Sequence, residues 1–296
     1  MTILNHWRGP AAYQTDSDTH PGIGDPTKNM LLGQDGGYGL DPAWYVRVGE
    51  GWDGQYAIRY TVDPSFFSGG EDVIPYGDAL FDTGLASTSQ RLHIACCRKY
   101  ASNYVFMPVG GGSLQKSMYA VSNVGNPTSD PMAGVVALGL LPGESGTDKG
   151  APGIDPDNHY VSFYSDWRYG EYTGFEWVSE SNGTMLEILR DTWYHWELGA
   201  DFTIGGGIGV FSLWITPLGG ATVLVVQRTW AHRFWNPATD VFDRYFLSNY
   251  YGGGGVPPYI MYIHECDHAI GDSYIGPPAG FSSGSSRTTK RIAVFG

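Results

Sequence analysis

Basic residues are scarce in this chain. Among its 296 residues Lys and Arg number 17 against 30 Asp and Glu, which gives a formal net charge of −13. Nucleic-acid binding needs clustered cations that neutralise phosphates, so we expect no nucleic-acid partner. The overall negative field also disfavours a polyanionic ligand.

Long hydrophobic runs are absent too. No segment approaches the roughly 20 apolar residues that span a bilayer. The opening MTILNHWRGPAAY lacks the basic start and apolar run of a secretory signal. We therefore expect no signal peptide, no membrane partner and a soluble protein, with a virion surface as one setting.

Cysteine is rare, with three residues at Cys96, Cys97 and Cys266. Neighbours in a strand point to opposite faces, so Cys96 and Cys97 should not pair with each other. The odd count and irregular spacing predict no disulfide framework. We expect all three to be buried as small apolar residues.

Glycine and aromatic residues are abundant instead. The chain has 43 Gly and 15% aromatic residues, a composition that suits short strands and tight turns. Helical periodicity is weak, with a short helix considered only near 184–190. The pattern predicts an all-β fold, an antiparallel β-sandwich of jelly-roll type, with strands at 44–49, 55–63, 89–98, 103–108, 158–166, 173–179, 192–200, 209–216, 221–228, 242–250, 258–270 and 290–295.

The predicted domain organisation has two parts. Residues 1–43, rich in Gly, Pro, Asp and Thr, indicate an extended N-terminal arm. Residues 44–296 form the jelly-roll domain, interrupted by a long loop insertion at about 109–157 in which 134–141 could form a buried strand.

The segment 192–215 is typical of a β-hairpin, with two apolar, aromatic-rich runs around a glycine turn. In its second run Val210, Ser212 and Trp214 should face one way, and Phe211, Leu213 and Ile215 the other. Such a hairpin can cover a core on one side and present aromatic surface on the other.

The stretch His264-Glu265-Cys266-Asp267-His268 matches the H-E-x-x-H pattern of zinc metalloproteases. That pattern requires a helix, whereas the preceding aromatic and β-branched run favours a strand. Histidines four apart in a strand lie roughly 13 Å from each other, too far to share one ion. We therefore predict no metal here. No cofactor is expected, except that Asp155, Asp157 and Asn158 could hold calcium.

Several motifs occur in the order found in concanavalin-like jelly rolls of the alginate and glucuronan lyase type. They are Ser89-Gln90-Arg91, Tyr104-Val105-Phe106 before Pro108, Trp193-Tyr194, Tyr250-Tyr251-Gly252-Gly253 and the segment 259–276. Over about residues 44–276 the chain resembles this family. The resemblance implies a jelly-roll sandwich with a saccharide groove.

Alternation in 89–98, 103–108 and 158–166 predicts one exposed wall, with Leu92, Ile94 and Cys96 facing the core. We predict that this wall binds a polysaccharide or surface glycan, through Ser89, Arg91, His93, Tyr104, Phe106, Tyr160 and Tyr164. A solvated sheet face or a protein interface is the alternative interpretation.

The family's chemistry removes a proton beside a uronate carboxylate. If the chain were a lyase, Arg91 would neutralise that carboxylate, and His93, Tyr104 and Tyr164 would supply the proton transfers. However, the stretch where the family carries a Lys reads Ser68-Gly69-Gly70-Glu71-Asp72, and Phe106 replaces a Tyr. Both departures oppose catalysis on a polyuronate.

The sequence therefore favours a non-catalytic glycan-recognition or assembly protein over an enzyme. One such role is a virion surface or decoration protein, with other virion subunits or further copies of itself as partners. The alternatives are an active polysaccharide lyase acting by β-elimination and, remotely, a zinc metalloprotease.

Overall fold

The computed structural model describes residues 3–7, 30–32, 45–55, 57–66, 79–82, 91–105, 114–122, 136–142, 159–165, 175–177, 184, 186–201, 203, 208–231, 242–247, 251–252 and 258–282. These residues form a sandwich of two antiparallel sheets, which confirms the predicted all-β jelly roll. Besides strands and turns, the described residues contain one 3₁₀ turn, η2 (Pro64–Phe66). In this part of the chain no helix is long and apolar enough to cross a membrane.

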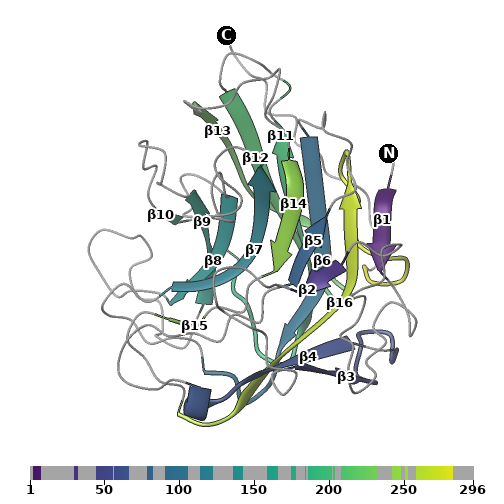
Figure 1. Cartoon of the computed structure of the whole chain (residues 1–296), viewed down its shortest axis with the longest axis vertical. Helices are drawn as coiled ribbons and strands as arrows, with labels where there is room; N and C mark the ends of the chain where they lie inside the picture. The colour runs from purple at the N-terminus through teal and green to yellow at the C-terminus, as the bar shows by residue number, and fades with distance from the viewer. Residues whose placement is uncertain are drawn as a thin grey trace.

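The first sheet has the order β13-β12-β11-β6-β16-β4-β3, and β1 pairs with β16 beside this path. Its strands are β1 (Ile3–Trp7), β3 (Tyr45–Val48), β4 (Ala57–Val62), β6 (Arg91–Tyr100), β11 (Trp193–Asp201), β12 (Ile208–Pro217), β13 (Val223–Ala231) and β16 (Met261–Gly271). Figure 1 shows β1 alongside β16 at one side of the molecule.

The second sheet has the order β10-β9-β8-β7-β14-β5-β2, and β15 pairs with β7. Its strands are β2 (Met30–Leu32), β5 (Ala79–Asp82), β7 (Leu114–Ser122), β8 (Val136–Pro142), β9 (His159–Ser165), β10 (Phe175–Trp177), β14 (Phe242–Leu247) and β15 (Tyr251–Gly252). The sheets overlap as layers in Figure 1, where β14 lies against β6 and β7 against β11.

The core lies on the inner face of the first sheet. Leu92, Ile94 and Cys96 of β6 are fully buried on this face, as predicted. By register, Leu198 of β11 lies beside Ile94 and Leu213 of β12 beside Leu198. This alternation is what a strand with one face in the core produces.

A charged pair is embedded in this core. Arg98 of β6 and Glu265 of β16 are opposite each other in register, and the Nε of Arg98 donates a hydrogen bond to Glu265 Oε1. Both residues are buried. Burial raises the pKa of Glu265 above its usual range, and the Arg98 guanidinium works against that rise. The two charges remain in the core because each is paired.

Some predicted elements differ from the observed ones. The segments 1–43 and 109–157 contribute strands to the sheets: β1 and β2 come from the first, and β7 and β8 from the second, where β8 confirms the strand expected at 134–141. The predicted strand at 103–108 is wrong over 103–105: a turn over 101–104, closed by a hydrogen bond from Tyr104 N to Ala101 O, follows β6, and 105 is not in a strand. Residues 106–108 and 290–295 lie outside the described part.

The helix considered near 184–190 is also wrong. Thr184 and residues 186–190 are not helical. Thr184 N donates a hydrogen bond to Val225 O, and Leu189 N donates one to the Tyr194 hydroxyl. The segment satisfies its backbone groups against neighbouring strands, which removes the need for intrahelical bonds.

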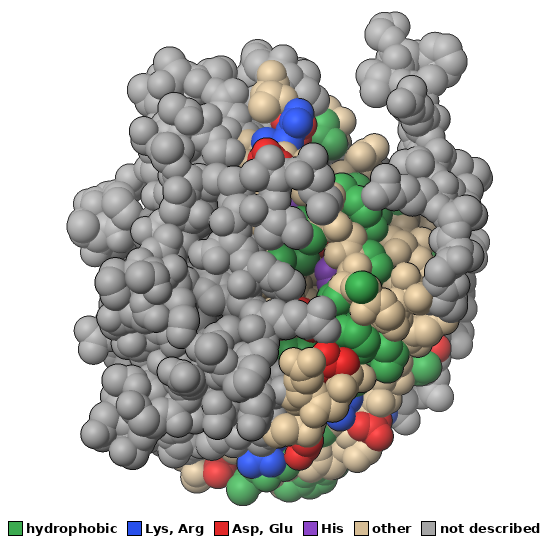
Figure 2. Space-filling model, turned by 90° about the vertical axis from the view of Figure 1, so that its right-hand side faces the viewer, with side chains coloured by type: hydrophobic (Ala, Val, Ile, Leu, Met, Phe, Trp, Pro, Cys, Tyr) green, Lys and Arg blue, Asp and Glu red, His purple; other side chains and the backbone are tan. Residues whose placement is uncertain are grey.

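Seen from the side where β1 and β16 lie, the described surface has a mixed character (Figure 2). Hydrophobic side chains (green) fill its middle, with histidine (purple) between them, and charged groups gather above and below.

Candidate functional site

The outward face of the first sheet carries the polar residues that alternate with the core positions. Arg91, His93 and Ala95 of β6 lie opposite Asp201, Gly199 and Glu197 of β11. Side chains of directly opposed residues share one face of an antiparallel sheet. β12 continues this row.

Trp214 of β12 lies opposite Glu197, and Ser212 lies opposite Gly199. The predicted hairpin and its alternation are therefore confirmed. Leu213 and Ile215 are fully buried in the core, while Trp214 keeps partial exposure on the other face.

Glu197 is the most constrained group on this face. Its carboxylate is fully buried and accepts three hydrogen bonds: from His93 Nδ1 at 2.8 Å, Ile275 N at 2.7 Å and Gly276 N at 2.8 Å. Charge-assisted bonds of this kind are stronger than neutral ones and offset the cost of burying the carboxylate. Glu197 thus fixes both the imidazole and the chain after β16.

Two aromatic rings extend from the imidazole. His93 stacks on Trp214 with ring centroids 5.6 Å apart at 26°, and Trp214 contacts Tyr274 at 5.0 Å and 60°. We call His93, Glu197, Trp214 and Tyr274 the histidine site.

Gly199 makes room for the histidine site. A Cβ at this position would lie 2.7 Å from His93 Cε1 and 3.0 Å from Trp214 Cζ3. Carbon atoms do not approach that closely without a shift, so only glycine lets the imidazole and the indole lie across β11.

Arg91 lies at the open end of the same face. Its guanidinium is held by Asp201, with Nε to Oδ2 at 2.8 Å, and its NH2 donates to the Thr203 hydroxyl at 3.3 Å. Burial favours the protonated carboxyl of Asp201, but hydrogen bonds from Thr203 and Arg91 outweigh it and lower the pKa. Arg91 remains 44% exposed while engaged in this pair.

The site can hold an imidazole in a fixed orientation. Nδ1 faces the Glu197 carboxylate, so this nitrogen carries the proton and donates. The other ring nitrogen is then left as the acceptor or proton carrier. Polar groups fixed beside partly exposed aromatic rings are suited to binding a ligand with both polar and apolar faces.

The structure brings together only part of the predicted wall. Arg91 and His93 share one face, as expected. Tyr104 does not join them: it is 1% exposed and packs on Tyr100 at 4.9 Å. The prediction that it faces outward is wrong because the chain turns after β6, directing the ring into the core.

Tyr160 and Tyr164 are in β9, which belongs to the second sheet, so the single wall joining 89–98 to 158–166 is also wrong. The remaining predicted glycan residues, Ser89 and Phe106, lie outside the described part. The calcium candidates Asp155, Asp157 and Asn158 lie outside it as well.

The H-E-x-x-H match lies in β16, so the prediction of a strand is confirmed. His264 Nε2 is 3.0 Å from Glu50 Oε2, and the motif's Glu265 pairs with Arg98 in the core. Glu265 is thus used in a core ion pair, while His264 lies beside a different carboxylate.

Sequence reasoning missed Glu197 and Tyr274 as site residues. A signal for Glu197 was present, because it is the one acidic residue within the apolar run Trp193–Ala200. A carboxylate inside a buried strand needs hydrogen-bond donors around it, so such a residue is a candidate for a functional site. Tyr274 carried no such signal.

No protein-family model matches the sequence, and no curated protein sequence matches it either. Solved structures do. The PL-14 alginate lyase from Aplysia kurodai is similar with a TM-score of 0.57 and 12% identity, over 92% of this chain and 100% of that chain. The fold is an alginate-lyase-type jelly roll.

A second similar structure is alginate lyase Aly36B. A mutant of it in complex with alginate tetrasaccharide gives a TM-score of 0.55 at 13% identity, over 93% of this chain and 100% of that chain. At such identities the likeness establishes the jelly-roll fold that the resemblance implied.

Proposed function

We propose that the chain binds a polysaccharide or surface glycan at the histidine site. The observation that carries this proposal is the buried Glu197, which locks His93 beside Trp214 and Tyr274. Sugar rings combine apolar C–H faces with hydroxyls, so aromatic rings next to a fixed imidazole suit them. The neighbouring lyase structure with bound tetrasaccharide supports the proposal by analogy of fold.

The charges favour a neutral glycan over a polyuronate. The net charge of −13 repels a polyanion. Arg91, the cation nearest to the site along β6, is already paired with Asp201. A carboxylated ligand would have to displace that aspartate.

Calorimetric titration with neutral and uronate oligosaccharides tests the proposal. Trp214→Ala should weaken binding at least tenfold. Tyr259→Ala is the matched control, since this exposed aromatic residue precedes β16 at the end remote from His93, and it should bind as wild type. Absence of binding to every oligosaccharide, or equal affinity in Trp214→Ala, would contradict the proposal.

A second candidate is polysaccharide lyase activity. One observation favours it: a carboxylate orients the His93 ring, as in general acid–base sites. Against it, Tyr104 is buried and Arg91 is paired. Ultraviolet absorbance of unsaturated products, rising with polyuronate and lost in His93→Gln, would establish catalysis in place of simple binding.

A virion-surface role stays a prediction from the sequence. The mass of the protein in solution, measured by light scattering, tests whether the chain assembles with copies of itself.

A further inference from the structure

A bulge interrupts β16 next to β6. The register runs regularly to Cys266 opposite Cys97 and resumes with Ala269 opposite Ala95, so β16 has one extra residue between them. Asp267 lies in this bulge with φ of 51°, in the left-handed region that non-glycine residues rarely occupy. Bulges redirect side chains, and strained backbone of this kind concentrates at functional positions.

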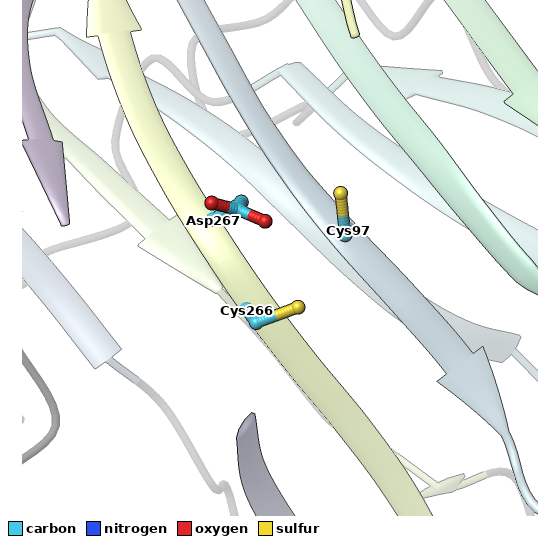
Figure 3. A group of neighbouring side chains, drawn as sticks. All are labelled: Cys97, Cys266 and Asp267. Atoms are coloured by element: carbon cyan, nitrogen blue, oxygen red, sulfur yellow. The ribbon is translucent and has the colours of Figure 1, made fainter. Parts of the chain in front are cut away.

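The redirected carboxylate meets two thiols. The Sγ atoms of Cys97 and Cys266 and a carboxylate oxygen of Asp267 all lie within 4.8 Å of one another, and all three residues are buried. Figure 3 shows Cys266 and Asp267 extending from β16 beside Cys97 on β6. Ligands of a tetrahedral zinc ion, at 2.0–2.3 Å from the metal, are separated by about 3.3–3.8 Å. The three groups therefore need only a small contraction to share an ion.

The surroundings resemble those of a ligand set. Trp52 Nε1 donates a hydrogen bond of 2.5 Å to Asp267 Oδ2. Metal-bound carboxylates are held by such outer hydrogen bonds. His195 of β11 lies opposite Cys97 in register, which places its side chain on the same face of the sheet.

We propose that Cys97, Cys266 and Asp267 form a three-ligand site for a thiophilic divalent cation of the Zn²⁺ class. Two sulfurs exclude Ca²⁺ and Mg²⁺, which take oxygen ligands. The ion offsets the negative charge of the deprotonated ligands, which this buried position otherwise disfavours. The site ties β16 to β6 and is separate from the histidine site. Two of the proposed ligands, Cys266 and Asp267, stand at the two variable positions of the H-E-x-x-H match, and neither of its histidines is a ligand.

The test begins with wild-type protein refolded with reductant and excess Zn²⁺, then freed of unbound metal. Elemental analysis should give one zinc per chain. Replacement by Co²⁺ should give the near-ultraviolet band of thiolate-to-cobalt charge transfer. Chelation of the zinc should lower the melting temperature. A zinc content far below one per chain, with an unchanged melting temperature, overturns the proposal.

Variants assign the ligands. Cys97→Ser and Asp267→Asn should lose zinc, whereas the matched control Cys96→Ser should keep it, because the Cys96 thiol points between the sheets. Trp52→Phe should bind zinc 10–100-fold more weakly, as loss of an outer hydrogen bond does elsewhere. If a ligand variant does not fold, the chelation and cobalt experiments on wild type still decide.

A disulfide between Cys97 and Cys266 is the alternative to metal binding. Directly opposed residues in antiparallel strands have Cα atoms about 4.5–5.5 Å apart, within the range of a disulfide. If protein that has been reduced and refolded with Zn²⁺ forms a Cys97–Cys266 disulfide again under air, found by mass spectrometry, the metal site is refuted. Equal zinc loss in Cys96→Ser would refute it too.

Discussion

Replacing Glu197 by Gln should lower both the stability of the protein and its affinity for a glycan. The carboxylate has no exposure and accepts bonds from His93 Nδ1, Ile275 N and Gly276 N. A glutamine side chain offers one oxygen in place of two. If that oxygen keeps the hydrogen bonds from His93 and Ile275, the new NH₂ group faces the N–H of Gly276. Two donors then oppose each other and neither has an acceptor.

The magnitude follows from these contacts. Loss of one charge-assisted bond costs about 1.5–3 kcal/mol, and an unsatisfied buried N–H adds about 1–3 kcal/mol. We expect a total loss of about 3–5 kcal/mol in the free energy of unfolding. Unfolding entropy is roughly 2 cal/mol/K per residue, so for 296 residues the melting temperature should fall by about 5–8 °C.

Thermal unfolding followed by circular dichroism measures this shift, and calorimetric titration measures the affinity. Glu187→Gln is the matched control, a partly buried glutamate outside the site that should change stability by no more than about 0.5 kcal/mol. If Glu197→Gln melts within 1 °C of this control, the carboxylate does not hold His93 and the 275–276 backbone as described.

Three further changes test other parts of the structure. Gly199→Ala places a Cβ 2.7 Å from the imidazole of the histidine site. This change should lower the free energy of unfolding by about 1–3 kcal/mol, measured by denaturant titration, and should weaken glycan binding tenfold. The control Gly49→Ala, whose Cβ meets nothing within 4 Å, should leave stability unchanged. Burial lowers the pKa of His195 to about 4, whereas in the unfolded chain the same imidazole takes up a proton near pH 6.5. The free energy of unfolding should therefore fall by roughly 3 kcal/mol between pH 6.5 and 4. If the pH dependence of stability is unchanged in His195→Gln, this histidine is not its cause. Arg98→Met alone should cost about 3–5 kcal/mol by leaving Glu265 unpaired in the core, and adding Glu265→Leu should recover much of it in the double variant's unfolding curve; no recovery would mean that the pair is not the source.

The local pattern of the chain determines much of what is observed. Alternation predicted that Leu92, Ile94 and Cys96 are inward and that Trp214 faces away from Leu213 and Ile215, because successive side chains of a strand point to opposite faces. The hairpin of β11 and β12 was predicted for the same reason, since its partners are close in sequence. Arg91 and His93 were correctly assigned to one face.

The predictions were wrong where the position of a residue depends on pairing or packing with a segment that is distant in the sequence. Alternation gives the faces of a strand but not the sheet to which the strand belongs, so β9 was joined to the wrong wall. Ser102 and Asn103 separate Tyr104 from β6, and only the packing against Tyr100 shows that the ring of Tyr104 enters the core. Residues far apart in the sequence meet through long-range pairing that local propensity does not encode.

The sequence by itself determined most of the strands, the inward and outward positions along β6, and a net negative charge that disfavours a polyanionic ligand. The tertiary structure alone decided that Glu197 meets the backbone of Ile275 and Gly276, and that Asp267 reaches Cys97 across a bulge. The physical reason is that a carboxylate or a thiol acquires its role from the donors and ligands around it, and in an antiparallel sandwich these arrive from strands that are neighbours in space and remote along the chain.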